Sequence, residues 1–169
     1  MQLYYDILPS PIGDLLIIAQ EYALREIVFQ AKEQVHTINS EWIHGSELIE
    51  QTKNELKAYF IGDLRQFTVQ VNPQGTPFQK QIWKAVMAIP HGQVCSYQDV
   101  ANKINNTSAC RAVGRANSQN PIPIIIPCHR VIGKSGKLTG YAGGLDRKQT
   151  LLGIEGVNTE DYPRQYKLF

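Results

Sequence analysis

The residues best suited to covalent chemistry are Cys128 and His129, which stand side by side after an apolar, proline-rich run over residues 121–127. A run of this kind is expected in the core, so Cys128 should lie where the interior meets a basic surface. A cysteine is nucleophilic as its thiolate, and nearby positive charge or a proton-accepting histidine favours that form. Alone, the pair favours inert packing, because free cysteines are usually small buried hydrophobes. The surrounding segments must therefore decide between the two interpretations.

The cysteine count points to a reducing environment. Cys95, Cys110 and Cys128 are the three cysteines, and none shows CxxC spacing, so neither a disulfide framework nor a zinc site is predicted. A cytoplasmic location fits this best. No apolar stretch approaches the roughly 18 residues that a membrane span needs, and the first residues lack the basic start of a signal peptide.

The charge is unevenly distributed along the chain. The whole sequence has a net charge of +2, yet residues 80–148 contain ten basic and two acidic side chains, so the remainder is net acidic. A basic segment is a weak footprint of nucleic-acid binding. By itself it leaves DNA binding and an ordinary solvated face about equally open.

The first 75 residues favour a small sheet with one helix. Ser46 is expected to cap a helix that runs to about Phe60, with Gly62 as its stop. Composition changes after residues 72–75, the best linker candidate, so we place one domain at residues 1–72 and a second at 73–169. The predicted strands are residues 3–8, 15–19, 24–29 and 67–71.

The second part favours short helices. Thr76 and Gln79 form a capping box for a helix that ends at Pro90, and Ser96 with Asp99 repeats this pattern for a second helix. A third helix should begin at Thr107 or Ser108, and the last two helices resemble a helix-turn-helix. In the third helix the buried face is predicted as Ala109, Ala112, Val113 and Ala116, and the outward face as Arg111, Gly114, Arg115 and Ser118.

Eight short segments around the Cys-His pair match one family in order and spacing. They resemble those of the methylated-DNA–protein-cysteine methyltransferases, also called O6-alkylguanine-DNA alkyltransferases, over roughly residues 76–156. The resemblance implies an α/β (α+β) fold, with a small ribonuclease H-like domain followed by a mainly helical DNA-binding domain containing the helix-turn-helix. The segments are Thr76-Pro77-Phe78-Gln79, Ile89-Pro90-His91-Gly92, Ser96-Tyr97, Arg111-Ala112-Val113-Gly114, Asn120-Pro121, Pro127-Cys128-His129-Arg130-Val131, Gly140-Tyr141-Ala142-Gly143-Gly144 and residues 148–156.

The resemblance assigns Cys128 as the acceptor of the alkyl group and His129 as the base that draws off its proton through a water. Glu155 matches the carboxylate that orients and charges that histidine, which completes a triad. Tyr97 matches a tyrosine that contacts the 3′ phosphate and donates toward N3 of the base, so that guanine leaves as a neutral species. Without the resemblance, Glu155 would be interpreted as a surface charge at a helix end and Tyr97 as a core aromatic.

Base flipping is implied, because an alkyl group on a base edge inside the duplex is out of reach of the thiolate. In the family the second helix of the helix-turn-helix enters the minor groove, and Arg111 matches the arginine that fills the gap left by the flipped nucleotide. Gly114 and Arg115 share that outward face, where a mid-helix glycine allows close approach to DNA or, alternatively, tight helix packing. Asn120 matches a hinge asparagine, and taken alone it is a polar turn residue.

Val131, Tyr141 and Ala142 match the wall of the base pocket, the last two within a glycine-rich loop. That loop fits neither GxGxxG nor the phosphate-binding loop pattern, so no cofactor is predicted. Some relatives have serine where this chain has Ala142, which leaves fine substrate preference open. Other relatives bind zinc through N-terminal cysteines, and this chain has none before Cys95, so no metal is expected.

The predicted function is DNA repair by irreversible, single-turnover transfer of a methyl or other alkyl group from O6-alkylguanine in double-stranded DNA to Cys128. O4-methylthymine is a further candidate substrate, and we expect a monomer with no membrane partner. Three alternatives stay open. One is a protein that recognises the lesion without repair, against which Cys128 argues; the others are a transcriptional regulator signalled by alkyl transfer, and a cysteine hydrolase using Cys128, His129 and Glu155 with turnover.

Overall fold

The computed structural model describes residues 1–31, 35–136, 138, 140–141 and 143–158. The chain forms two compact units, Met1–Gln74 and Gly75–Phe169. The first holds a sheet and the second is mainly helical, which confirms the predicted α/β (α+β) fold class. Within the described residues, no helix combines the length and apolar character needed to cross a bilayer.

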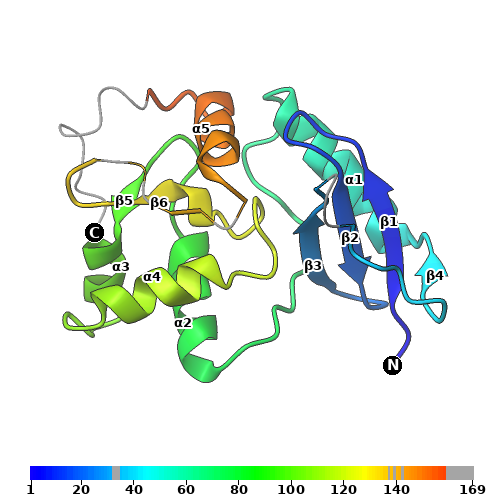
Figure 1. Cartoon of the computed structure of the whole chain (residues 1–169), viewed down its shortest axis with the longest axis horizontal. Helices are drawn as coiled ribbons and strands as arrows, with labels where there is room; N and C mark the ends of the chain where they lie inside the picture. Colours follow the sequence, from blue (N-terminus) through cyan, green and yellow to red (C-terminus); the bar gives the residue numbers. More distant parts are fainter. Residues whose placement is uncertain (32–34, 137, 139, 142, 159–169) are drawn as a thin grey trace. The chain divides into compact units, whose positions relative to one another are not determined.

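The first unit is built on a four-stranded sheet in the order β3-β2-β1-β4. β1 (Tyr4–Leu8), β2 (Leu15–Ala19) and β3 (Leu24–Phe29) pair antiparallel, close to the predicted ranges. All five residues of β2 are buried, as a continuous apolar run in a central strand requires. The helix α1 packs against β1 and β2, as Figure 1 shows.

The helix α1 (Glu47–Phe60) begins and ends as predicted. The side chain of Ser46 accepts a hydrogen bond from the backbone N of Ile49 at 3.2 Å, which caps the first turn. Beyond the other end, Gly62 has a φ of 84°. Glycine adopts this left-handed conformation without steric cost, so the helix ends there.

The strand predicted over residues 67–71 is wrong. Among the described residues, this segment makes one isolated parallel bridge, from Val71 to β3. The carboxylate of Glu55 in α1 accepts hydrogen bonds from the backbone N of Thr68 at 2.8 Å and from the Thr68 hydroxyl. The Glu55 side chain therefore accepts the backbone hydrogen bond that Thr68 would otherwise donate to a neighbouring strand.

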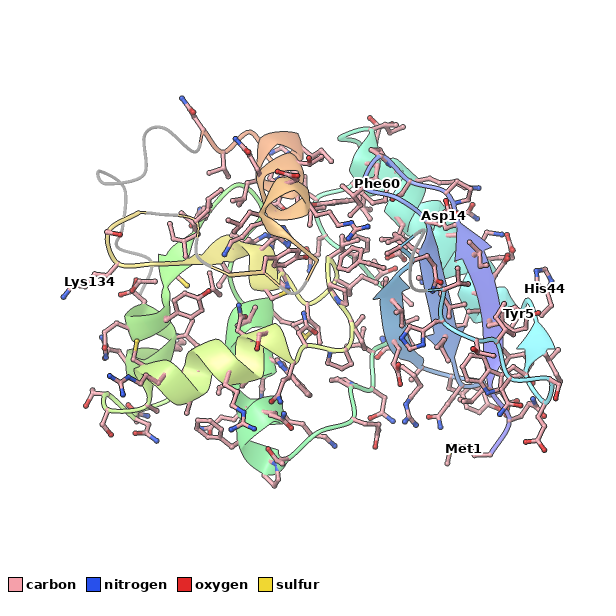
Figure 2. All side chains as sticks on the ribbon, in the orientation of Figure 1. Met1, Tyr5, Asp14, His44, Phe60 and Lys134 are labelled. Atoms are coloured by element: carbon pink, nitrogen blue, oxygen red, sulfur yellow. The ribbon has the colours of Figure 1, made fainter. Side chains whose placement is uncertain are left out.

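A two-residue strand, β4 (Ile43–His44), pairs in parallel with β1 and is absent from the sequence prediction. The rings of Tyr5 and His44 pack edge to face, with 5.5 Å between their centroids. Both residues lie at the same edge of the sheet in Figure 2. His44 Nε2 also lies 3.0 Å from Asp6 Oδ1. Two residues are too few for periodicity to reveal a strand.

The second unit begins with α2 (Pro77–Met87), which has the predicted capping box. Thr76 Oγ1 accepts from the backbone N of Gln79 at 3.2 Å, and Gln79 Oε1 accepts from the backbone N of Thr76 at 2.8 Å. The buried indole of Trp83 donates to a backbone carbonyl of α4 (Cys110–Ser118) at 2.9 Å. This bond ties α2 to α4 inside the core.

The helix α3 (Tyr97–Lys103) follows the predicted capping box of Ser96 and Asp99 and packs against α4. The start of α4 differs from the prediction, because Thr107 and Ser108 lie in a turn and the helix begins at Cys110 without a side-chain cap. A polar residue before a helix caps it only when its backbone is extended and its oxygen reaches the N2 or N3 amide.

The buried face of α4 also differs from the prediction. Val113, Ala116 and Asn117 are buried, whereas Ala112 is exposed. Asn117 is accommodated inside because its amide has an internal hydrogen-bond partner, described below, and such a partner offsets the cost of burying a polar group.

Short elements connect these helices to the C-terminal helix. β5 (Cys95–Ser96) and β6 (Val131–Ile132) pair in parallel, which brings the start of α3 beside the segment after the 3₁₀ turn η1 (Cys128–Arg130). The helix α5 (Leu145–Ile154) contacts η1, and its Leu152 packs into a buried cluster with a residue of β6. The elements thus converge on η1 (Figure 1).

Candidate active site

The loop before η1 is held in a demanding conformation. Ile124 is fully buried with a φ of 76°, a left-handed value that a β-branched residue rarely adopts. Asn120 brackets this loop, since its Oδ1 accepts from the backbone N of Ile122 at 2.9 Å and its Nδ2 donates to the carbonyl of Ile126 at 2.8 Å. The amide of Asn120 therefore fixes the path of the chain into η1.

Cys128 begins η1 and is buried, with 4% of its surface exposed. Its carbonyl accepts a hydrogen bond from Nδ2 of Asn117 in α4 at 3.2 Å. Burial raises the pKa of the Cys128 thiol, and it outweighs the opposite effects of hydrogen bonds from Asn120 and Tyr141 and of the charge on Lys148. The sulfur is therefore a protonated thiol at neutral pH, and a base must take its proton for it to react.

His129, the next residue along the chain, is fully buried. Its Nε2 lies 2.7 Å from Glu155 Oε1, which assigns the ring proton to Nε2 as the donor. Among the described residues, Nδ1 is buried and has no hydrogen-bond partner. Burial lowers the pKa of His129, so the ring is neutral and Nδ1 is a proton acceptor next to Cys128 in the chain.

Glu155 caps the C-terminus of α5 and is buried among donors. Arg130 Nε donates to its Oε2 and Arg130 Nη2 to its Oε1, both at 2.9 Å, and the backbone N of Gly92 donates to Oε2 at 3.2 Å. Burial alone would raise the pKa of Glu155, but the bonds from His129 and Arg130 hold it well below its ordinary value. The carboxylate is therefore charged at neutral pH.

Lys148 is a second buried charge beside the thiol. Its side chain is fully buried in α5, and Nζ donates to the carbonyl of Val131 at 2.7 Å. Burial lowers the pKa of Lys148 to about 8, against an upward effect of Cys128. At neutral pH the ammonium is charged, and its field favours a thiolate on Cys128.

Two of the three predicted pocket-wall residues, Val131 and Tyr141, lie in the described part of the chain. Val131 is fully buried in β6, and Tyr141 is half-buried and near enough to the Cys128 thiol to lower its pKa. Ala142 lies outside the described residues. The structure therefore brings Tyr141 and Asn120 to the sulfur, while Val131 faces the core and carries the acceptor for Lys148.

The predicted DNA-contacting residues lie on α3 and α4. Arg111 and Arg115 are exposed and one helical turn apart, so they share a face of α4. Gly114 faces Tyr97, the first residue of α3, since a Cβ built on the glycine would lie 3.7 Å from the ring. This is ordinary van der Waals contact, so packing between the helices accounts for a small residue at this position without requiring it to be glycine.

No group of three or more His, Cys, Asp or Glu side chains in the described part of the chain is arranged to hold a metal ion.

Comparison with known families identifies the chain. Residues 77–157 match the sequence model described as 6-O-methylguanine DNA methyltransferase, DNA binding domain, and residues 3–73 match that described as 6-O-methylguanine DNA methyltransferase, ribonuclease-like domain. The chain belongs to the 6-O-methylguanine DNA methyltransferase family.

Individual relatives agree across almost the whole length. A methylated-DNA–protein-cysteine methyltransferase of Methanosarcina mazei is 47% identical over 92% of this chain and 99% of its own. The crystal structure of Mycobacterium tuberculosis OGT in complex with DNA has a TM-score of 0.81 at 43% identity, covering 90% of this chain and 92% of its own. That of the Mycobacterium tuberculosis O6-methylguanine methyltransferase has a TM-score of 0.82 at 40% identity, covering 97% of each chain.

These matches confirm the predicted family, and they confirm the predictions of a DNA-repair methyltransferase and of a ribonuclease-like first part. The roles given to single residues stay predictions.

Four residues of the site in this 6-O-methylguanine DNA methyltransferase family member have no role in the sequence prediction. They are the donors to Glu155 and to Cys128 O, and the buried lysine: Arg130, Gly92, Asn117 and Lys148. Arg130, Gly92 and Lys148 stand in the matching segments, but the partners of these three lie 17 to 63 residues away in sequence. Only the folded chain shows which of the basic residues are internal.

Proposed function

We propose that this chain repairs DNA by moving the alkyl group of O6-alkylguanine irreversibly onto Cys128, once per molecule. The observation that carries the proposal is His129, a buried neutral imidazole whose Nε2 is held by Glu155 while Nδ1 is open to accept a proton. A thiol that is protonated at rest needs such an acceptor next to it.

The Cys128 proton passes through a water to Nδ1 of His129, and the sulfur attacks the alkyl carbon as the carbon–O6 bond breaks. The electron pair of that bond returns to the guanine, which Tyr97 protonates at N3, so a neutral base leaves. The Tyr97 phenolate then regains a proton from water, and His129 releases to water the proton that it took from Cys128. The product is a thioether on Cys128, and it offers no leaving group that water or a thiol displaces. O4-methylthymine, which also carries its methyl on an exocyclic oxygen, is a further proposed substrate.

The decisive experiment is an intact-mass measurement after incubation with duplex DNA containing one O6-methylguanine. One methyl gained per molecule, absent in Cys128→Ala and retained in Cys110→Ser, supports the proposal. Cys110 is the matched control because it is a half-buried cysteine on α4, away from His129 and Glu155. Release of product without modification would indicate a cysteine hydrolase instead, and binding without any mass change would indicate a lesion-recognition protein.

We infer further that α3 and α4 act as a helix-turn-helix and that Arg111 stabilises the flipped-out state of the lesion. The exposed pair Arg111 and Arg115 on one face of α4 supports this, because such a face suits a phosphate backbone. Arg111→Ala is expected to slow repair of duplex DNA at least tenfold while sparing reaction with the free alkylated base; Arg65→Ala, an exposed arginine of the first unit, is the control. Equal losses on both substrates would refute the role of Arg111 in extrusion.

We propose that the protein works as a monomer in the cytoplasm. The free cysteines among the described residues, Cys95, Cys110 and Cys128, are compatible with a reducing compartment. Light scattering coupled to size exclusion should return the mass of one chain, and a dimer mass would contradict the monomer.

A further inference from the structure

One carboxylate oxygen in the site is shared between two donors. Glu155 Oε1 accepts from His129 Nε2 at 2.7 Å and from Arg130 Nη2 at 2.9 Å. Arg130 holds the other oxygen as well, through Nε at 2.9 Å. The guanidinium of Arg130 therefore binds both oxygens of Glu155 in a bidentate ion pair. This geometry makes arginine–carboxylate pairs strong and directional.

The third nitrogen of the guanidinium is also used. Arg130 Nη1 donates to the carbonyl of Ile89, just beyond α2, at 2.6 Å, and the side chain is only 7% exposed. The plane of the guanidinium is thus fixed at one end by Ile89 and at the other by Glu155. Because three nitrogens of the buried guanidinium are hydrogen-bonded, the Arg130 side chain is held in place. It therefore fixes the position of the Glu155 carboxylate.

The charges have a direct consequence for His129. An unshared buried carboxylate would favour the imidazolium and hold the proton on the ring, whereas Arg130 neutralises most of that charge at the shared oxygen. We propose that Arg130 is a positioning residue which, by gripping Glu155, keeps His129 neutral and able to take the Cys128 proton. This rests on the proposed function only in assigning His129 as the base.

The other charged groups around His129 do not have the same effect on its protonation as Arg130. On η1 and α5 they are Glu155 and Lys148, and Lys148 favours the neutral ring as Arg130 does. α2, which also packs against η1, carries Lys80 and Lys84, both exposed and therefore strongly screened. Arg130 shares the acceptor Glu155 Oε1 with the imidazole.

The test is a proton titration of His129 by histidine ring NMR in the full chain, which does not depend on repair activity. Cys128→Ser serves as the background, so that the thiol does not titrate beside the ring, and loss of a signal in His129→Gln assigns it among the four histidines. Adding Arg130→Gln should raise the pKa of His129 by about 1 unit or more. Adding Arg65→Gln, an exposed arginine of the first unit, should leave it unchanged.

A second variant protects the test against misfolding. Arg130→Lys keeps the positive charge, but its single ammonium does not reproduce both arms of the fork. The pKa of His129 should then lie between those of the background and of Arg130→Gln. An Arg130→Lys protein with the same His129 titration as the background would overturn the proposal even if Arg130→Gln does not fold.

The rate of alkyl transfer supplies the matching activity readout. With Cys128 restored, the acidic limb of the single-turnover rate against pH should move upward in Arg130→Gln by the shift measured by NMR. An NMR shift without a matching rate shift would overturn the role in proton transfer. A wild-type chain that gains no methyl would instead refute the proposed function, while the titration would still decide whether Arg130 controls the charge of His129.

Discussion

Replacing Lys148 by methionine removes a buried ammonium whose charge the folded protein disfavours. The pKa of Lys148 falls from 10.5 to about 8, mainly through burial. At about 1.36 kcal/mol per unit, the folded state at neutral pH carries a cost of about 3 kcal/mol for holding this charge. Methionine removes that cost and loses the hydrogen bond to Val131 O, which is worth about 1–3 kcal/mol because it leaves a buried acceptor unpaired. The net change at pH 7 is therefore expected to be a stabilisation of about 1 kcal/mol.

The pH dependence gives the sharper measurement. Because the folded pKa of Lys148 is below the unfolded one, the unfolded chain binds more protons between about pH 8 and 10.5, and stability rises with pH across that window. Replacing Lys148 by methionine should abolish this rise, which amounts to about 3 kcal/mol. Urea unfolding at pH 7 and at pH 10.5, with and without Lys148→Met, measures it directly.

The buried thiols need to be controlled in this experiment. The folded pKa values of Cys128 and of Cys95, the latter raised to about 12, lie above the ordinary value of 9.0, so both thiols make stability fall as pH rises above it. Both proteins should therefore carry Cys128→Ser, and their difference cancels the contribution of Cys95. A difference in unfolding free energy that is the same at both pH values would refute the reasoning.

Three further changes have defined outcomes in urea unfolding. Glu155→Gln should lower stability by about 3–5 kcal/mol, because it leaves the charge of Arg130 buried without its partner; a loss below 1 kcal/mol would contradict this. Gly75→Ala places a Cβ 2.5 Å from the buried ring of Trp83 and should cost about 1–3 kcal/mol, and unchanged stability would show that the ring moves aside freely. Thr76→Ala removes the cap of α2 and should cost about 1 kcal/mol, with Thr76→Ser, which keeps the hydroxyl, as the control.

Local signals explain what the sequence predicted well. The cap of α1 at Ser46 and the capping box of α2 at Thr76 and Gln79 depend on residues at most three positions apart. The strand β2 likewise follows from a continuous apolar run. These features form wherever their short sequence occurs in a compatible environment, so pattern reasoning finds them.

The failures and omissions depend on distant partners. Residues 67–71 have the alternation of a strand, yet Glu55 captures their donors from α1. The resemblance to a family indicated Cys128, His129 and Glu155, but it gave no partner for the carboxylate other than His129. That Gly92, 63 residues away, donates to Glu155 is a property of the folded chain alone.

The hydrogen bond from Asn117 to the carbonyl of Cys128 links the opening of α4 to the exposure of the Cys128 thiol. Helix ends fray, and Asn117 stands next to the last residue of α4, so each fraying event that breaks this bond also loosens the turn that buries the sulfur. The rate at which cellular oxidants react with the Cys128 thiol would therefore depend on how often the end of α4 opens. Amide hydrogen exchange at that terminus and the oxidation rate of Cys128 should accordingly rise and fall together.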